Sequence, residues 1–308
     1  MTKISNFKVV PFNEPDYYFR KHNDKESEPP KGAKKNLSGM IDITLTTEES
    51  LYIGSGFIGT DTKNAYKSFL KCDGKAIIPG SSLKGSVKHI SRIAASGCLD
   101  ERRERDIEYD VENYDIKCDM DNRCIICDTF GGLFTKVKEK GARKGARKSK
   151  VVFGDLIAES PQYEIKNLEI QFQPSIKNPL CSEKIGNRYH LIGYKLYLGK
   201  CVKTVPVEVE PVEMVKKGTK FKGKIFFDKL TDHELGMLCF ALGIGSKGIY
   251  IKLGGYKSCG CGKVSIDGVL TVNGKKSNPD DYVNVYGRFV NDDVWESMDD
   301  VENILGVK

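Results

Sequence analysis

The stretch "IIPGSSLKGSVKHI", residues 77–90, decides how the rest of the chain is interpreted. An apolar run ends in Pro-Gly, and the segment that follows has apolar residues at helical spacing. The pattern predicts a strand, a turn and a helix, with Ser81 and Ser82 as caps at the helix start. Because a helix start carries free amide groups, the junction is either purely structural or a phosphate site for a nucleotide or a polynucleotide.

A basic face runs along the same helix, because Lys84, Lys88 and Arg92 recur every four residues. Together with Ser81 and Ser82, these side chains are the predicted phosphate contacts. The chain has no Walker A motif, so a nucleotide-hydrolysing P-loop is not expected.

A second glycine-rich segment, "LGGYKSCGCGKV", spans residues 253–264. Glycines let the backbone approach a ligand closely, and successive amide groups in such turns bind anions. The alternative is a tight hairpin entry without a ligand. The candidate binding residues in this segment are Gly254, Gly255, Lys257, Ser258, Gly260, Gly262 and Lys263.

The net charge is concentrated in one tract. The chain of 308 residues has a net charge of +7, and residues 136–150 alone hold eight basic side chains against one acidic side chain. Such a glycine-interrupted run predicts a mobile loop, which is either merely solvated or an RNA-contacting arm using Arg143, Lys144 and Arg147. The sequence shows neither a long apolar run nor a signal peptide, so we expect a cytoplasmic protein without a membrane partner.

Three of the ten cysteines form a C-x5-C-x2-C cluster, Cys118, Cys124 and Cys127. In a reducing compartment, clustered thiols are candidate ligands for a tetrahedral zinc ion. The fourth ligand must come from elsewhere, with Cys98 the first choice and His89 the second. The alternative to a structural zinc site is a set of unliganded thiols.

The order of expected elements predicts an α+β fold of the ferredoxin-like or RRM-like type. Strand patterns at residues 39–56, 149–160, 167–175, 219–230 and 260–272 alternate with helices that start near residues 80 and 231. The second helix has a capping box, Thr231 with Glu234. We expect one domain over residues 1–308, a zinc-binding and basic insertion at 98–150, and an acidic C-terminal helix at 280–308.

The two glycine segments together resemble the RAMP superfamily of CRISPR-associated proteins, specifically Cas7-like subunits of type III effector complexes. The resemblance rests on the motif "IPGSSLKGSVKHI" and, far downstream, on "LTDHELGMLCFALGI" with "KLGGYKSCGCGKV". The stretches "SGMIDITLTTEESLYIGSG", "SKVVFGDLIAES" and "GTKFKGKIFFDKLT" also look like strands of that family, and the opening "FKVVPFNEP" looks like the start of a RAMP subgroup.

The resemblance implies a subunit that binds the sugar-phosphate backbone of a guide RNA (crRNA), pairs that guide with target RNA and assembles with other effector subunits. It also implies zinc knuckles, and a loop aspartate that cleaves target RNA with Mg²⁺, for which Asp61 is the candidate. Two alternatives remain, namely a Cas6-like endoribonuclease that processes precursor crRNA and a capping or scaffold subunit without chemistry.

Overall fold

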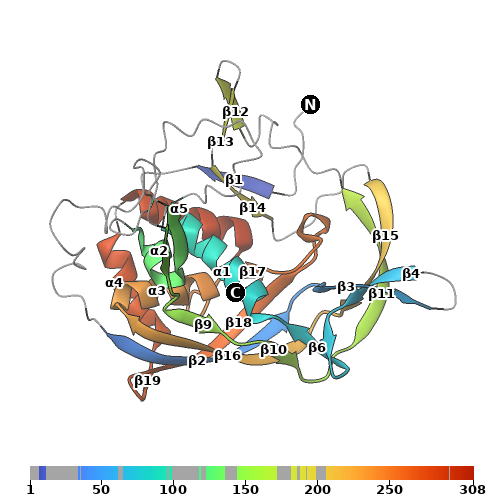
Figure 1. The fold of residues 1–308 in the computed structure, drawn as a ribbon, viewed down its shortest axis with the longest axis horizontal. Coiled ribbons are helices and arrows are strands. Elements are labelled where there is room, and N and C mark those ends of the chain that lie inside the picture. Colours follow the sequence, from blue (N-terminus) through green and yellow to red (C-terminus); the bar gives the residue numbers. More distant parts are fainter. Residues whose placement is uncertain are drawn as a thin grey trace.

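A computed structural model shows a mixed α/β chain in which strands predominate (Figure 1). The structure describes residues 7–11, 34, 36–61, 65–95, 97–98, 118, 123–135, 144–171, 182–185, 188–191, 193–198, 206–290 and 292–308. Within these ranges the helices lie toward one end of the molecule, and a smaller sheet lies toward the other end (Figure 1).

The largest sheet has nine strands. In order across the sheet these are β17 (Ile251–Lys252), β18 (Lys263–Val272), β2 (Leu37–Thr47), β16 (Lys220–Leu230), β10 (Leu156–Ala158), β6 (Lys75–Ile78) and β5 (Lys71–Cys72), with β9 (Val151–Phe153) beside β16 and β19 (Lys275–Ser277) beside β18. Alternation along β2 buries Ile41, Ile43 and Leu45, as the sequence predicts. Their partners on β16 include Phe221 and Ile225, which are also buried.

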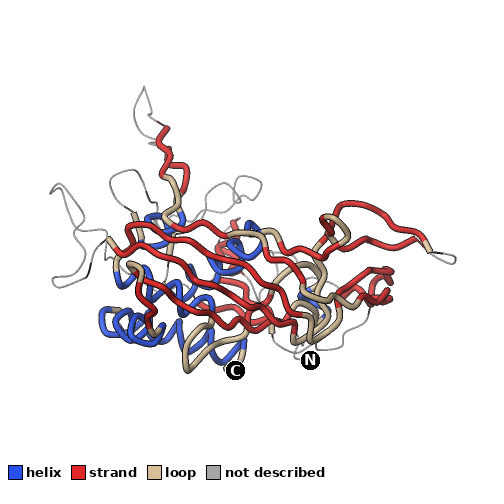
Figure 2. Tube along the Cα trace, turned by 90° about the horizontal axis from the view of Figure 1, so that it is seen from below, coloured by secondary structure: helices blue, strands red, loops and turns tan. Residues whose placement is uncertain are grey.

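The five α-helices of the described chain gather on one side of this sheet (Figure 2), and a short 3-10 helix spans Lys257–Cys259. The α-helices are α1 (Gly80–Ala94), α2 (Ile125–Phe130), α3 (Asp232–Leu242), α4 (Pro279–Phe289) and α5 (Asp292–Leu305). The expected apolar stripe of α1, which includes Leu83 and Val87, is fully buried. The capping box of Thr231 and Glu234 is confirmed, and α3 is buried on every side because α1, α4 and β16 all pack against it.

The order of the main strands across this sheet differs from their order along the chain. The chain runs from β2 through α1 to β9 and β10, and then from β16 through α3 to β18. Across the sheet, however, the order is β18-β2-β16-β10, and each of these neighbours pairs in the antiparallel direction. The segment 149–160, expected as a single strand, forms the two strands β9 and β10. Gly154 and Asp155 separate these two strands. The Gly154 amide donates a hydrogen bond to the Lys224 carbonyl oxygen, and the Asp155 carboxylate accepts one from the Gly80 amide at the start of α1.

A second sheet of four strands was not expected from the sequence. Its order is β11 (Tyr163–Gln171), β15 (Pro206–Val215), β4 (Ala65–Phe69) and β3 (Gly54–Thr60). The glycine-rich stretch at residues 54–59 therefore lies in the strand β3. The β3–β4 hairpin extends away from the body of the molecule, at the end opposite the helices (Figures 1 and 2).

Three further strand pairs complete the described structure. They are β1 (Phe7–Pro11) with β14 (Gly193–Tyr197), β12 (Ser182–Ile185) with β13 (Arg188–Leu191), and β7 (Gly132–Thr135) with β8 (Lys144–Arg147). The last pair corrects the prediction that the whole basic tract 136–150 is an irregular loop. Residues 144–147 pair with residues 132–135, so the end of the tract is ordered by a strand partner.

The C-terminal segment 280–308 holds parts of two helices rather than the single expected helix. Asn278 caps α4 through a hydrogen bond to the Asp280 amide, and Pro279 occupies the first helical position. The helix ends at Val290, whose backbone is extended, and α5 follows. In the part of the chain that the structure describes, no helix combines the length and the apolar character needed to cross a membrane.

Candidate nucleic-acid groove and cysteine cluster

The start of α1 differs from the capped phosphate site that the sequence predicts. Pro79 occupies the N-cap position without a side-chain cap, and Ser81 and Ser82 lie inside the first turn. The Gly80 amide donates a 2.8 Å hydrogen bond to the Asp155 carboxylate. Glycine is needed at position 80 because a Cβ there would lie 2.1 Å from the Phe153 carbonyl oxygen. The Asp155 carboxylate therefore already accepts the hydrogen bond of the first amide of α1, and this amide is not available to a phosphate.

The strongest candidate site is instead a groove of about 810 Å³ along the side of α1. It lies between α1, β14 and the segment around β17, which meet near the centre of the molecule (Figure 1). Its lining residues are Tyr52, Ile53, Gly54, Ser81, Ser82, Gly85, Ser86, Lys88, His89, Ile90, Arg92, Lys195, Leu196, Tyr197, Lys252, Gly254, Gly255, Lys257 and Leu305. Among these described residues are five lysine or arginine side chains and no aspartate or glutamate.

The groove brings together the two segments that the sequence singled out. Ser81, Ser82, Lys88 and Arg92 line it from α1, and Gly254, Gly255 and Lys257 line it from the glycine-rich segment. The first and second halves of the chain therefore contribute to one basic surface, although about 170 residues separate them.

Several predicted contacts do not line the groove. Lys84 is one of them, and its pKa is lowered by burial and by the neighbouring Lys88. The other predicted residues of the glycine-rich segment outside the lining are Ser258, Gly260, Gly262 and Lys263.

Gly262 and Lys263 have structural contacts of their own. A Cβ at Gly262 would lie 2.0 Å from the Leu253 carbonyl oxygen, so glycine is required for close packing. The Lys263 amine lies 3.8 Å from the centre of the Tyr250 ring, where the charge contacts the aromatic face.

The cations of the groove are not equivalent. The Lys252 amine donates to the carbonyl oxygens of Gly260 and Cys261 at 3.1 and 3.0 Å, so this lysine holds the glycine-rich segment. Lys195 lies over the Tyr197 ring, with 4.8 Å between its amine and the ring centre. Burial lowers the pKa of Lys257, because the charged amine loses hydration. An anion that replaces this hydration would restore the pKa.

The sequence interpretation missed Lys195, Lys252 and Tyr52 as groove residues. Lys195 lies on β14, which pairs with β1 and carries no motif of its own. Lys252 and Tyr52 lie next to the glycine-rich segments at residues 253–264 and 54–59, and this adjacency was the one available signal. Of the basic tract, Arg143 and the Lys144 side chain lie outside the described residues.

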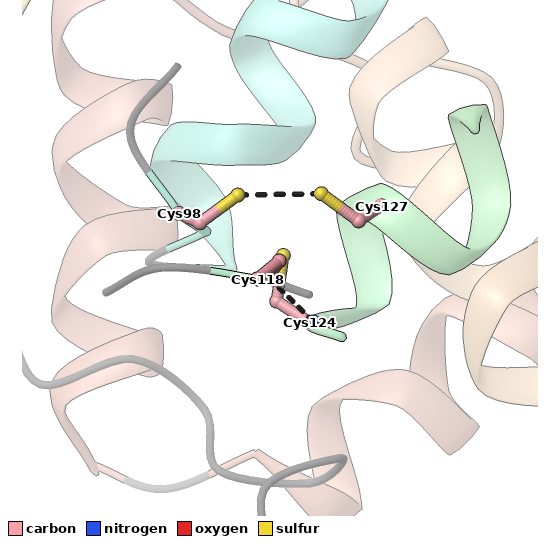
Figure 3. Close-up of side chains that lie close together, drawn as sticks. All are labelled: Cys98, Cys118, Cys124 and Cys127. Carbon is pink, nitrogen blue, oxygen red and sulfur yellow. Dashed lines mark hydrogen bonds between the residues drawn. The ribbon is translucent and has the colours of Figure 1, made fainter. Parts of the chain in front are cut away.

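Four cysteines form a compact cluster beside α1 and α2 (Figure 3). The sulfur atoms of Cys98, Cys118, Cys124 and Cys127 all lie within 4.8 Å of one another, and the described chain holds no other group of three or more such ligands. The sulfurs of Cys98 and Cys127 are 3.3 Å apart. His89, the second-choice ligand, instead lies 3.0 Å from the Lys195 carbonyl oxygen.

The thiols of this cluster shift one another's acidity. Hydrogen bonds from the thiols of Cys118, Cys127 and Cys98 hold the pKa of Cys124 well below its usual range. Hydrogen bonds with Cys118 and then with Cys124 raise the pKa of Cys98 and of Cys127. Four clustered thiols are a donor set that could hold a soft or borderline divalent metal ion.

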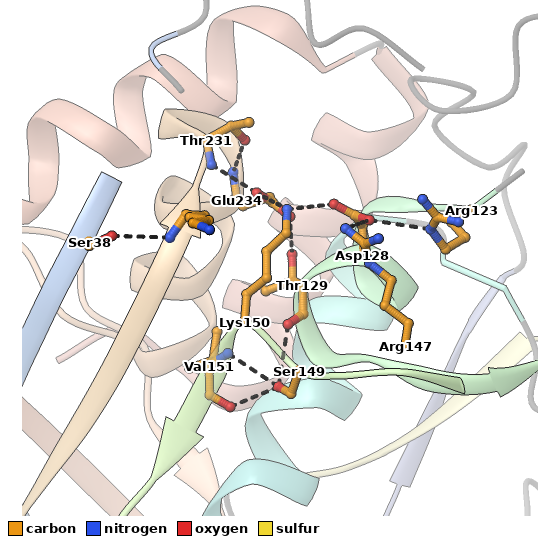
Figure 4. Close-up of polar contacts among 11 residues, drawn as sticks. Ser38, Arg123, Asp128, Thr129, Arg147, Ser149, Lys150, Val151, Thr231 and Glu234 are labelled. Carbon is orange, nitrogen blue, oxygen red and sulfur yellow. Dashed lines mark hydrogen bonds and ion pairs between the residues drawn. The ribbon is translucent and has the colours of Figure 1, made fainter. Parts of the chain in front are cut away.

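A buried polar network connects α2 to α3 (Figure 4). The Lys150 amine lies 2.5 Å from Asp128 and 2.7 Å from Glu234, so one cation bridges two carboxylates. Arg147 also pairs with Asp128, at 2.7 Å. Although burial opposes the effect, the pairs with Lys150, Arg147 and Arg123 lower the pKa of Asp128. Arg147, a predicted RNA contact, is therefore engaged in the packing of α2.

Asp61, the candidate catalytic residue, is exposed and follows β3 directly, at the turn of the β3–β4 hairpin. It does not line the groove. Within the described chain, no group of three or more metal-binding side chains includes it.

The model of the RAMP superfamily matches residues 44–265, which is most of the chain. The chain belongs to the RAMP superfamily. Among solved structures, Csc2 of Thermofilum pendens is similar, with 15% identity and a TM-score of 0.41, over 94% of this chain and 82% of that chain. No curated protein matches the chain at a significant level.

Proposed function

We propose that this RAMP protein binds the sugar-phosphate backbone of an RNA in the groove beside α1. One observation carries the proposal, namely that the lining has five lysine or arginine side chains and no described carboxylate. Cations and serine hydroxyls contact phosphates, which position an RNA without reading its sequence. Lys88, Arg92 and Lys257 supply the phosphate contacts, since Lys252 is committed to the backbone of the glycine-rich segment.

The RNA that we propose is a guide crRNA, and the chain acts as a Cas7-like backbone subunit of a type III CRISPR ribonucleoprotein. Membership of the RAMP superfamily supports this assignment. The strand order β18-β2-β16-β10, with helices α1 and α3 as crossovers, supports a ferredoxin-like core. In such a complex the guide pairs with target RNA, and other effector subunits are the protein partners.

We also propose that Cys98, Cys118, Cys124 and Cys127 hold one structural zinc ion. Tetrahedral Zn–S bonds of about 2.3 Å place sulfurs roughly 3.8 Å apart, and a cluster within 4.8 Å fits this requirement after small rotations of the side chains. Four protein ligands leave no open position, so the metal would stabilise the fold rather than activate water.

Cleavage of target RNA is a separate proposal that rests on Asp61 and added Mg²⁺. The exposed position of Asp61 on an extended hairpin is compatible with a role outside the groove. A carboxylate there would bind Mg²⁺ through one contact, with the RNA phosphate supplying others.

The purified protein, guide RNA and labelled complementary RNA test these proposals together. Binding of the guide that weakens in Lys88→Ala supports the groove, whereas equal affinity of both proteins would contradict it. Mg²⁺-dependent cuts that disappear in Asp61→Ala support target cleavage. Cuts in a precursor crRNA would instead indicate a Cas6-like enzyme, and binding without any cleavage would indicate a scaffold.

A further inference from the structure

Tyr52 is an aromatic residue in the lining of the groove. This residue precedes β3 and lines the groove together with Gly54 and Gly255. Its ring is half-buried, and its centre lies 5.2 Å from that of Tyr256 at an interplanar angle of 55°. Tyr52 therefore contacts a second aromatic ring while it still lines the basic groove.

Glycines surround Tyr52 in a way that leaves no room for other side chains. A Cβ at Gly254 would lie 2.2 Å from the Tyr52 carbonyl oxygen, and one at Gly255 would lie 3.0 Å from the ring. A Cβ at Gly54 would lie 3.1 Å from the hydroxyl oxygen of Tyr52. The Gly255 amide also donates to the Tyr52 carbonyl oxygen, at 3.0 Å. The glycines of both segments thus accommodate and fix this tyrosine.

Tyr256 is itself held in place behind Tyr52. Its hydroxyl donates a 2.6 Å hydrogen bond to Glu210, which also pairs with Lys67 at 2.7 Å. Burial, followed by this bond to Glu210, raises the pKa of Tyr256 to about 12, so the hydroxyl keeps its proton at neutral pH. The φ angle of Tyr256 is +54°, a left-handed conformation that costs a bulky residue free energy. Such strain persists where surrounding contacts fix a functional arrangement.

We propose that one nucleobase of the bound RNA stacks on the Tyr52 ring, with the adjoining phosphates on the groove cations. This inference rests on the proposed RNA-binding function and adds a base contact to the phosphate contacts. Lys88, Arg92 and Lys257 would bind the backbone, while Tyr52, which lines the same groove, would present its aromatic face to the base. Bases in a duplex are paired and stacked on one another, so only an unpaired base reaches such a face. Tyr256 is a positioning residue that fixes the plane of the Tyr52 ring.

Fluorescence anisotropy with a single-stranded RNA of about ten nucleotides tests the inference. Tyr52→Leu removes the aromatic face, and we expect about a 5- to 150-fold weaker affinity, the usual range for one stacked base. The salt dependence of binding should stay unchanged, because no charge is lost. Tyr52→Phe keeps the face and should retain most of the affinity. Tyr282→Leu, which changes a half-buried tyrosine on α4 outside the groove, is the matched control.

Two further probes distinguish a failure of base stacking from a failure of phosphate binding. An oligomer of the same length with abasic sites should bind the wild type as weakly as the intact RNA binds Tyr52→Leu. The fluorescence of a 2-aminopurine base in the intact RNA should be quenched on binding. This measurement tests stacking in the wild type even if Tyr52→Leu fails to fold. Equal affinity for intact and abasic RNA, or for the wild type and Tyr52→Leu, would overturn stacking but leave phosphate binding in place. Absence of all RNA binding by the wild type would overturn both.

Discussion

The substitution Lys150→Met tests how α2 is fixed to α3. The Lys150 amine is largely buried between Asp128 and Glu234, and the Glu234 side chain has 0% exposure. Removing one partner of a buried ion pair leaves an uncompensated charge and costs about 3–5 kcal/mol. Since a domain has a total stability of about 5–15 kcal/mol, we expect a large drop in the urea midpoint, followed by circular dichroism.

A matched control separates burial from charge. Lys222 pairs with Glu159 at the same 2.7 Å distance, but the two side chains are 61% and 46% exposed. Because water screens such a pair, Lys222→Met should cost less than about 1 kcal/mol. Adding Glu234→Gln to Lys150→Met should recover part of the loss, since glutamine removes the buried charge and still completes a capping box with Thr231.

The loss in Lys150→Met should also depend on pH. Burial raises the pKa of Glu234 even though Lys150 acts in the opposite direction, so removing Lys150 raises that pKa further. A carboxyl whose pKa is raised by folding stabilises the fold when protonated, and this contribution disappears as the pH rises through the folded-state pKa. The deficit should therefore be smaller near about pH 5 than near about pH 7.5. Equal losses in Lys150→Met and Lys222→Met, at both pH values, would refute the reasoning.

Three other substitutions address the groove, the cluster and the helix start. Lys88→Ala should weaken RNA binding and reduce the slope of log affinity against log salt by about 0.7, measured by anisotropy at several salt concentrations; an unchanged slope would remove Lys88 from the phosphate contacts. Cys127→Ser should lower the zinc content measured by mass spectrometry and also the melting temperature, and full zinc retention would contradict a four-cysteine site. Asp155→Ala should cost about 0.5–2 kcal/mol in urea unfolding, because the Gly80 amide loses its acceptor, and a neutral result would show that this bond is replaced by water.

Periodicity predicted the central elements well, since local pattern and tertiary burial agree there. The alternation of Ile41, Ile43 and Leu45 identified β2, and the capping box of Thr231 and Glu234 located the start of α3. The strand expected at residues 167–175 overlaps β11, but the second sheet itself was missed because its strands pair over a long range, as in the parallel contact of Val212 with Lys67. No local pattern encodes a partner that is about 145 residues away.

The candidate site was predicted in outline and corrected in detail. The sequence placed Lys88 and Gly254 on a shared surface, and the structure brings both into one groove. The sequence offered the helix start as a phosphate site, whereas the Gly80 amide there donates to the Asp155 carboxylate. The local motif could not predict this, because the carboxylate lies 75 residues further along the chain. Cys98 was chosen as the fourth member of the cysteine cluster, and its sulfur does lie with the other three.

The meeting of Cys98 with Cys118 joins two points of the chain that lie 20 positions apart in the sequence. The entropy of closing a loop of chain grows slowly, by about 0.6 kcal/mol for each doubling of its length. The geometry of the cluster therefore depends little on how many residues separate these two cysteines. Extra sequence inserted between them, such as an affinity tag, should leave the cluster and the groove intact.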